Sequence, residues 1–276
     1  MKVRAGDVRI AFDEAGPMTG TPLVLLHGFP HDRTLWRPQL RALSAQCRCI
    51  APDLRGFGES DIAPPFSMDR YADDVARLLD ALAIERAVIG GLSMGGYVAL
   101  AFWRRHAERV RALVLADTRA GADTTEGAAK RRAMIELARE RGSAAVADAM
   151  MTGMIGKRTR ARHPDLVAQV RAMCASAPVE GVIGALNAML ARPDSTPTLA
   201  TIDVPTLIVV GEDDVLASPS ESRAMHAAIS GSTLEIISGA GHVSNLERPA
   251  SFNHVVSELM HQVSGAAPAS SYGGLR

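Results

Sequence analysis

Short apolar runs alternate along the chain with longer stretches in which apolar residues recur at helical spacing. Runs such as residues 23–26 and 206–210 are apolar almost throughout, which is typical of central parallel strands covered by helices on both faces. The alternation predicts the α/β class, with a mostly parallel central sheet between layers of helices. The expected strands are residues 8–12, 23–26, 47–51, 87–91, 112–116, 206–210 and 234–237.

Two helices are predicted between these strands and one after the last of them. Residues 68–83 carry a stripe formed by Val75, Leu78, Leu79 and Leu82, and residues 97–106 follow a pair of glycines. Both are expected to be crossover helices. Pro249 stands near the start of the last helical stretch, residues 252–263, where the missing N–H has no intrahelical partner to lose.

Residues 118–200 interrupt the alternation, because they contain no convincing strand and favour several helices rich in alanine, methionine and arginine. They are predicted to form an inserted helical cap between two parts of a core domain, residues 1–117 and 201–264. Residues 265–276 are small, polar and glycine-rich, and are expected to be a disordered tail. Methionines in the cap either line an adaptable pocket or, as is more common, fill the core: Met134, Met150, Met151, Met154, Met173 and Met189.

The composition is that of a globular protein with no dominant charge. Of the 276 residues, 47% are hydrophobic and 22% charged, and 30 basic residues balance 30 acidic ones. The balance favours small-molecule partners over nucleic acid, a membrane or a highly charged substrate. Basic clusters at residues 104–105, 131–132 and 157–162 have no interleaved aromatic residues, so they are interpreted as solvated helix faces.

Cysteine usage and the absence of long apolar segments indicate the compartment. Cys47, Cys49 and Cys174 are odd in number and lack the spacing of metal ligands, so neither a disulfide framework nor a zinc site is expected. The N-terminus has no apolar h-region, and no segment has the ~18 uninterrupted apolar residues that a membrane span needs. A protein of the reducing cytoplasm fits these features.

The sharpest chemical signal is the sequence Gly-Leu-Ser-Met-Gly-Gly at residues 91–96, which follows one predicted strand and precedes a predicted helix. That strand–turn–helix context is the one that a nucleophile elbow requires. Glycines on either side of Ser93 let the chain adopt a strained, crowded turn. Ser93 is therefore the candidate nucleophile, since a glycine-rich turn without function is less compatible with this context.

A base and an orienting acid follow later in the chain. His242 comes after the expected strand at residues 234–237 and is the candidate general base, whereas the other histidines have the pattern of surface or structural residues. Asp214 follows the strand at residues 206–210 and is the preferred acid, with Asp213 second. Asp117 is an alternative acid position, although a role as a turn cap suits it better.

The loop after residues 23–26 is expected to help stabilise an oxyanion. Backbone N–H groups of Phe29 and Met94 are the predicted donors, and His27 is expected to shape this loop rather than to act as a base. Pro30 lacks an N–H and cannot be a donor, so it is predicted to be a pocket residue that sets the direction of the carbonyl there. Trp36 is a further predicted pocket residue.

The chain resembles the α/β-hydrolase superfamily over nearly its whole length, apart from the predicted cap and tail. The similarity rests on five blocks in order: Leu-Leu-His-Gly-Phe-Pro at residues 25–30, Pro-Asp-Leu-Arg-Gly-Phe-Gly-Glu-Ser at 52–60, the block at 91–96, Gly-Glu-Asp-Asp at 211–214, and Gly-Ala-Gly-His at 239–242 with Glu-Arg-Pro at 247–249. Within the superfamily it looks like small esterases, enol-lactonases and cofactor-free haloperoxidase or perhydrolase relatives. Epoxide hydrolases and haloalkane dehalogenases carry aspartate in place of Ser93, which argues against both.

The resemblance implies hydrolysis of a carboxylic ester or lactone through an acyl-serine intermediate, with no metal and no organic cofactor. Because the charge is balanced and the sequence has no clear basic pocket, small to medium neutral substrates are expected. A perhydrolase activity, suggested by Pro30, is an alternative on the same residues. An alternative of another class is a non-catalytic ligand-binding protein on a hydrolase scaffold.

Overall fold

The computed structural model describes residues 1–265, and the predicted disordered tail lies outside these residues apart from Gly265. An eight-stranded sheet with the order β1-β2-β4-β3-β5-β6-β7-β8 forms its centre. β1 pairs antiparallel with β2 and β2 with β4, whereas all later pairs are parallel, which confirms the predicted mostly parallel sheet. The strands are β1 (Lys2–Ala5), β2 (Val8–Ala15), β3 (Pro22–Leu26), β4 (Arg48–Pro52), β5 (Ala87–Leu92), β6 (Val110–Ala116), β7 (Thr206–Gly211) and β8 (Thr233–Ile237).

Each predicted strand overlaps an observed one, and β1 is the strand that the apolar pattern missed. β1 lies at the edge of the sheet beside β2, and its Lys2 and Arg4 are exposed. A strand with one solvated face does not form a continuous apolar run, so its pattern is hard to distinguish from that of a polar N-terminus.

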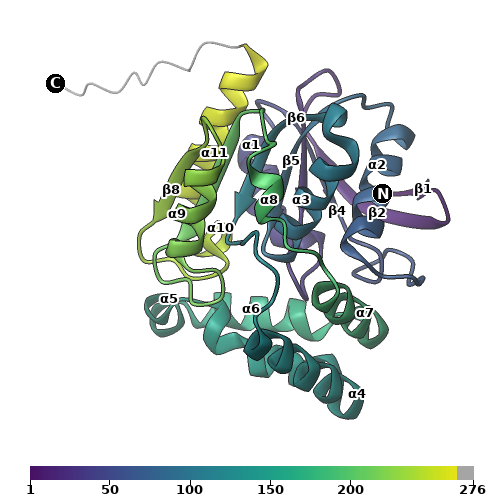
Figure 1. Cartoon of the computed structure of the whole chain (residues 1–276), viewed down its shortest axis with the longest axis vertical. Coiled ribbons are helices and arrows are strands. Elements are labelled where there is room, and N and C mark those ends of the chain that lie inside the picture. Colours follow the sequence, from purple (N-terminus) through teal and green to yellow (C-terminus); the bar gives the residue numbers. More distant parts are fainter. Residues whose placement is uncertain (266–276) are drawn as a thin grey trace.

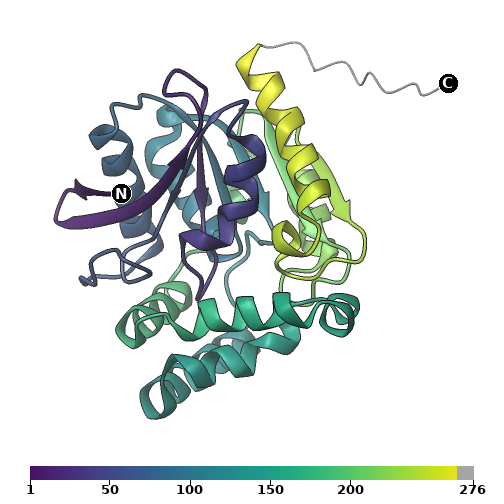
Figure 2. The same cartoon turned by 180° about the vertical axis from the view of Figure 1, so that it is seen from behind.

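Helices cover both faces of the sheet. α2, α3 and α9 lie on the face seen in Figure 1, and α1 and α11 lie on the face seen in Figure 2. Each layer buries its own cluster of apolar side chains against the strands. The helices around the sheet are α1 (Arg37–Leu43), α2 (Met68–Ala81), α3 (Met94–His106), α8 (Thr196–Leu199), α9 (Pro219–Ala228), α10 (Ser244–Glu247) and α11 (Pro249–Ser264), with short 3-10 turns at Arg33–Trp36 and Ala107–Arg109.

Four further helices, inserted between β6 and β7 and called the cap, lie together at one end of the sheet (Figure 1). The longest is interrupted at Gly142, whose φ of 74° is not helical. Within residues 1–265 no single helix is long and apolar enough to span a membrane, and α6 with α7 passes that test only as a pair bent by 90°. The four are α4 (Thr125–Met154), α5 (Lys157–Arg162), α6 (Pro164–Ala175) and α7 (Val179–Leu190).

Candidate active site

Ser93 occupies a sharp turn between β5 and α3. β5 ends at Leu92 and α3 begins at Met94, so Ser93 alone makes the connection, with φ 55° and ψ −114°. This positive φ is costly for a residue with a side chain and persists only where neighbours hold it. The Ser93 N–H donates to the carbonyl of Ala116 at 2.9 Å, and the Thr118 hydroxyl donates to the Ser93 carbonyl at 2.7 Å.

The two glycines that flank Ser93 are required by close backbone approach. A Cβ atom at Gly91 would lie 2.1 Å from the carbonyl oxygen of Gly95, and one at Gly95 would lie 2.2 Å from the carbonyl oxygen of Leu26. Their absence of side chains therefore lets α3 begin directly against β5 and against the loop that follows β3.

The structure brings the three predicted catalytic side chains into one hydrogen-bonded chain. His242 lies in the loop after β8, and its Nε2 atom is 2.8 Å from Ser93 Oγ. Its Nδ1 atom is 2.8 Å from Asp214 Oδ2. A neutral imidazole that donates from Nδ1 to the carboxylate leaves Nε2 free to accept the serine proton, as a general base must.

Among the candidate acids, Asp214 alone contacts the histidine. Its Oδ2 atom accepts from His242, and its Oδ1 atom accepts the N–H groups of Leu216 and Ala217 at 2.8 and 3.0 Å. The Asp213 residue is exposed, and its own N–H donates to the carbonyl of Ala240.

Asp117 braces the loops around the site instead of contacting His242. Its Oδ1 atom accepts the N–H of Gly211, and its Oδ2 atom accepts the hydroxyl of Ser244 at 2.5 Å. Burial, together with the charge of Asp214, raises the pKa of Asp117 to about 8. Both oxygens of Asp117 are thus engaged by Gly211 and Ser244, and neither contacts the imidazole of His242.

The electrostatic environment favours a basic histidine. Burial by itself lowers the pKa of His242, but the charge of Asp214 and its hydrogen bond outweigh burial, with smaller contributions from Asp117 and Glu247. The pKa of His242 is therefore raised above its ordinary value. This shift strengthens His242 as a proton acceptor.

Glu247 ties the histidine loop to the cap. One carboxylate oxygen accepts the N–H of Gly241 at 2.9 Å, and the other accepts the N–H of Gly156 at 3.1 Å. The N–H of His242 donates to the carbonyl of Met154 at the end of α4. The position of the base therefore depends on the C-terminal end of α4.

The predicted oxyanion donors are the N–H of Phe29, in the loop after β3, and the N–H of Met94, at the start of α3. Within residues 1–265, neither the Phe29 N–H nor the Met94 N–H has a hydrogen-bond partner, so both can serve a ligand. Met94 is the first residue of α3, where N–H groups have no intrahelical partner. His27 is fully buried, and its Nε2 atom accepts the Leu54 N–H at 3.0 Å, which is a structural role and not that of a base.

A cavity of about 620 Å³ opens onto Ser93 and His242. Phe29 and Tyr97 contribute to its wall from the core, and the cap forms much of the remainder. The six cap methionines divide between the two predicted roles. Met134, Met150 and Met189 line the cavity, whereas Met151, Met154 and Met173 are buried outside its lining.

The predictions that Trp36 and Pro30 line the pocket are wrong. Trp36 is completely buried and packs against Phe252, with 5.9 Å between ring centroids, in the core cluster on the α11 side of the sheet. Pro30 is buried directly after Phe29 and does not line the cavity. Both residues were predicted to line the pocket because they are close in sequence to Phe29. Their side chains are instead buried in the protein interior.

Charged residues also line the cavity, which the sequence did not indicate. Arg119, Lys130 and Arg131 share its wall with Asp123 and Glu126. The interpretation of residues 131–132 as a solvated helix face is therefore wrong for Arg131, which pairs with Asp123, and holds only for the exposed Arg132. Tyr97, one helical turn after Ser93, could have been found from its spacing, whereas Arg119 and Asp123 carried no signal.

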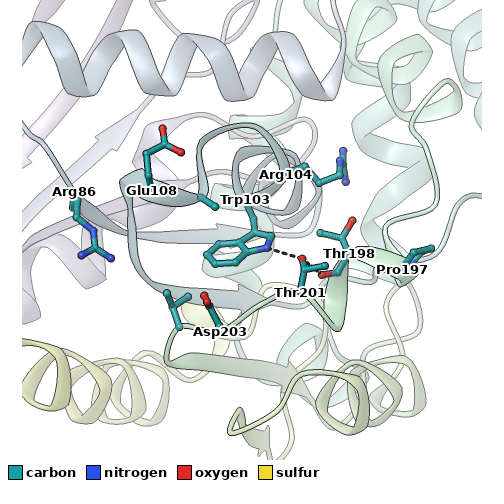
Figure 3. Close-up of a pocket in the computed structure, with 10 residues that line it drawn as sticks. Arg86, Trp103, Arg104, Glu108, Pro197, Thr198, Thr201 and Asp203 are labelled. Atoms are coloured by element: carbon teal, nitrogen blue, oxygen red, sulfur yellow. Dashed lines mark hydrogen bonds between the residues drawn. The ribbon is translucent and has the colours of Figure 1, made fainter.

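A second, larger cavity of about 780 Å³ lies at the far end of α3 from Ser93. Figure 3 shows Trp103 in its centre, with the indole N–H donating to the hydroxyl of Thr201 at 3.0 Å. None of Ser93, Asp214 and His242 lines it, so the smaller cavity is the candidate active site. In the part of the chain that the structure describes, no group of three His, Cys, Asp or Glu side chains could hold a metal ion.

Known proteins share this arrangement of elements. A family model described as alpha/beta hydrolase fold matches residues 21–249. The chain belongs to the α/β-hydrolase family. It is 30% identical to 3-oxoadipate enol-lactonase 1 of Acinetobacter baylyi over 90% of this chain and 91% of that protein.

Solved structures agree with this membership. A thermophilic esterase from Thermogutta terrifontis, determined with malate bound, has a TM-score of 0.91 and 39% identity, over 95% of this chain and 98% of that one. The enol-lactonase from Burkholderia xenovorans LB400 has a TM-score of 0.88 and 30% identity, over 94% and 99%. These relatives support hydrolase activity on esters or lactones.

Proposed function

We propose that this α/β-hydrolase is a serine hydrolase that cleaves small to medium carboxylic esters or lactones through an acyl-serine intermediate. The observation that carries the proposal is the chain of two 2.8 Å hydrogen bonds from Ser93 through His242 to Asp214. The esterase and enol-lactonase relatives support the same chemistry.

In the first half of the proposed reaction, Ser93 Oγ attacks the scissile carbonyl while His242 Nε2 takes the hydroxyl proton. Asp214 stabilises the imidazolium that forms, and the N–H groups of Phe29 and Met94 bind the oxyanion. Collapse of this intermediate expels the alcohol, which receives the proton from His242. In a lactone the alcohol remains attached to the acyl group.

In the second half, His242 accepts a proton from water, and the resulting hydroxide attacks the acyl-serine. The second tetrahedral intermediate expels Ser93, which regains its proton from His242, and the carboxylic acid leaves. No oxidant or reductant is consumed, so the net reaction is ester plus water to acid plus alcohol.

The proposal is tested with a fluorophosphonate probe and p-nitrophenyl acetate. We expect the probe to label Ser93 in the wild-type protein, and we expect Ser93→Ala to abolish both labelling and ester turnover while its circular dichroism spectrum stays unchanged. A folded wild-type protein that neither labels nor turns over esters would instead be a non-catalytic ligand-binding protein. Peracid formation on the same residues stays a prediction, and comparing turnover of acetate with hydrogen peroxide against ester hydrolysis tests it.

A further inference from the structure

Three arginines converge on one buried carboxylate in the wall of the active-site cavity. The side chain of Asp123 is only 3% exposed. It accepts from Arg119 Nη2 at 2.9 Å and from Arg131 Nη2 at 3.3 Å, and Arg192 Nη1 lies 3.0 Å from its Oδ1 atom. A single carboxylate cannot balance three guanidinium groups, which remain charged at every physiological pH.

The neighbouring carboxylates do not remove this imbalance. Glu221 lies 3.5 Å from Arg119 and is 36% exposed, so water screens it. Glu126 pairs with Lys130 at 2.7 Å, and these two charges cancel. Hydrogen bonding to Thr196 and the charge of Arg192 both lower the pKa of Asp194, but Asp194 is exposed and screened by water. Three cations therefore face one buried anion, Asp123, beside the cavity.

Hydrogen-bond donors are in surplus as well. Each guanidinium has five N–H groups, and buried donors are normally satisfied. The Nε atom of Arg119 is nevertheless buried without a partner in the described part of the chain. Arg131 Nη1 faces the sulfur of Met189 at 3.2 Å, and a thioether is a weak acceptor. The cluster therefore has donor capacity that oxygen atoms of a ligand would use.

The cluster is placed within reach of a substrate at Ser93. Arg119 directly follows Thr118, whose hydroxyl donates to the Ser93 carbonyl at 2.7 Å. Tyr97 lies one helical turn after Ser93, and the guanidinium of Arg192 lies 4.2 Å from the centroid of the Tyr97 ring. Arg119, Arg131, Tyr97 and Ser93 all line the same cavity. A ligand with its carbonyl at Ser93 can thus present its remote end to the two arginines.

We propose that this cavity selects esters or lactones whose acyl part carries a carboxylate a few carbons from the scissile carbonyl. Arg119 and the Nη1 atom of Arg131 would hold that carboxylate through charge-assisted hydrogen bonds, while the Nε and Nη2 atoms of Arg131 remain bound to Asp123. Asp123 and Arg192 position the two arginines and do not contact the substrate. The inference rests on the proposed esterase function, and it replaces the expectation of a neutral substrate, which assumed that no basic pocket existed.

A matched pair of esters tests the inference on the wild-type protein. In mono-p-nitrophenyl glutarate the acyl chain ends in a carboxylate, and in p-nitrophenyl 5-methylhexanoate an isopropyl group of similar shape takes its place. We expect kcat/KM to be at least about tenfold higher for the glutarate ester, because hydrogen bonds between charged groups are worth that much. We also expect free glutarate to inhibit competitively and the preference to shrink with added salt.

Variants assign the preference to the cluster. Arg119→Met should lower the ratio of the two kcat/KM values roughly ten- to hundredfold, and Arg119→Lys should lower it less. Arg171→Met is the control, because it removes the same charge from an arginine that pairs with Asp148 on the cap surface, outside the cavity. This control should leave the ratio unchanged.

Each outcome decides the inference. A wild-type protein that cleaves both esters without preferring the glutarate ester, or equal ratios for Arg119→Met and Arg171→Met, would overturn the anionic subsite and leave the esterase proposal intact. If Arg119→Met does not fold, the wild-type ratio and the inhibition by glutarate decide. Failure to cleave either ester, with no fluorophosphonate labelling of Ser93, would overturn the proposed function itself.

Discussion

Asp214 Oδ2 lies 2.8 Å from His242 Nδ1, while the second oxygen of the same carboxylate is held by two backbone N–H groups. The carboxylate is thus fixed in position by the turn that follows β7. Asp213, its neighbour in sequence, is exposed and belongs to the same turn. The two adjacent aspartates offer a matched test of which one orients the histidine.

We predict that Asp214→Asn lowers kcat on the order of ten thousand-fold, because an amide favours the wrong imidazole tautomer and cannot stabilise the imidazolium. Asp213→Asn should change kcat by less than about twofold, since it removes an exposed charge that touches neither reacting group. Steady-state kinetics with p-nitrophenyl acetate measure both. The reverse ranking would assign the orienting role to Asp213.

Ser93 and His242 should behave as one catalytic unit. We predict that Ser93→Ala and His242→Ala each reduce kcat by roughly a million-fold, and that the double variant is no slower than either single one. The reason is that each group is useless without the other once the 2.8 Å hydrogen bond between them is lost. Additive losses in the double variant would contradict this coupling.

The pH dependence of kcat/KM follows from the raised pKa of His242. Burial lowers this pKa, but Asp214 outweighs it, so we expect the acid limb of the profile to have its midpoint above the ordinary value of about 6.5. Activity falls as the pH drops through this midpoint, because only the neutral imidazole accepts a proton. Asp214→Asn removes the opposing charge, so NMR titration of His242 in that variant should give a lower pKa. A pKa that does not fall would exclude Asp214 as its main cause.

The strands other than β1, and the grouping of Ser93, His242 and Asp214, were predictable because local patterns determine them. β5 and β7 are buried on both faces and so form continuous apolar runs, and glycine is needed around Ser93 because a Cβ atom at Gly91 would lie 2.1 Å from the carbonyl oxygen of Gly95. Chain order then places the acid and the histidine after two later strands. These features can therefore be predicted without knowing how the cap packs against the core.

The charge of the cavity wall was not predictable for the opposite reason. Arg131 and Arg132 are neighbours on α4, yet one pairs with the buried Asp123 and the other faces solvent. Which of them enters the cavity depends on the rotation of α4 against the core, which is a tertiary property. The prediction for Trp36 was wrong for a similar reason. Its ring packs against Phe252 of α11, and this contact could not be inferred from its distance in sequence from Phe29.

A buried ion pair offers a prediction about stability. The Arg55 side chain is completely buried, and it donates to both oxygens of Asp74 at 2.6 and 2.7 Å. Arg55→Met removes both hydrogen bonds of the buried Asp74 carboxylate and leaves it facing Arg77 Nη1 at 3.7 Å, so we expect the free energy of unfolding in urea to fall by about 3–5 kcal/mol. Arg105→Met, which breaks a more exposed pair with Asp73, should cost no more than about 1 kcal/mol.

The larger loss of stability expected for Arg55→Met is attributed to the buried carboxylate of Asp74. A second substitution at Asp74 tests this explanation. Replacing Asp74 by leucine in the Arg55→Met background should recover much of the lost stability, because an apolar pair of similar volume removes the unpaired charge. A double variant as unstable as Arg55→Met alone would mean that packing, and not the stranded carboxylate, accounts for the loss.

Gly241→Ala tests whether the cap positions the catalytic base. A Cβ atom at Gly241 would lie 2.4 Å from the backbone N of Gly156 and 3.0 Å from a Glu247 oxygen, so either the cap or the histidine loop must move. Displacing a reacting group by about 1 Å costs roughly a hundredfold in rate, and we therefore expect kcat to fall ten- to hundredfold with little change in KM. Gly121→Ala is the control, because a Cβ atom there meets nothing within 4 Å. If both variants keep wild-type kcat while remaining folded, the contacts of Glu247 with Gly241 and Gly156 hold the cap in place without setting the geometry of His242.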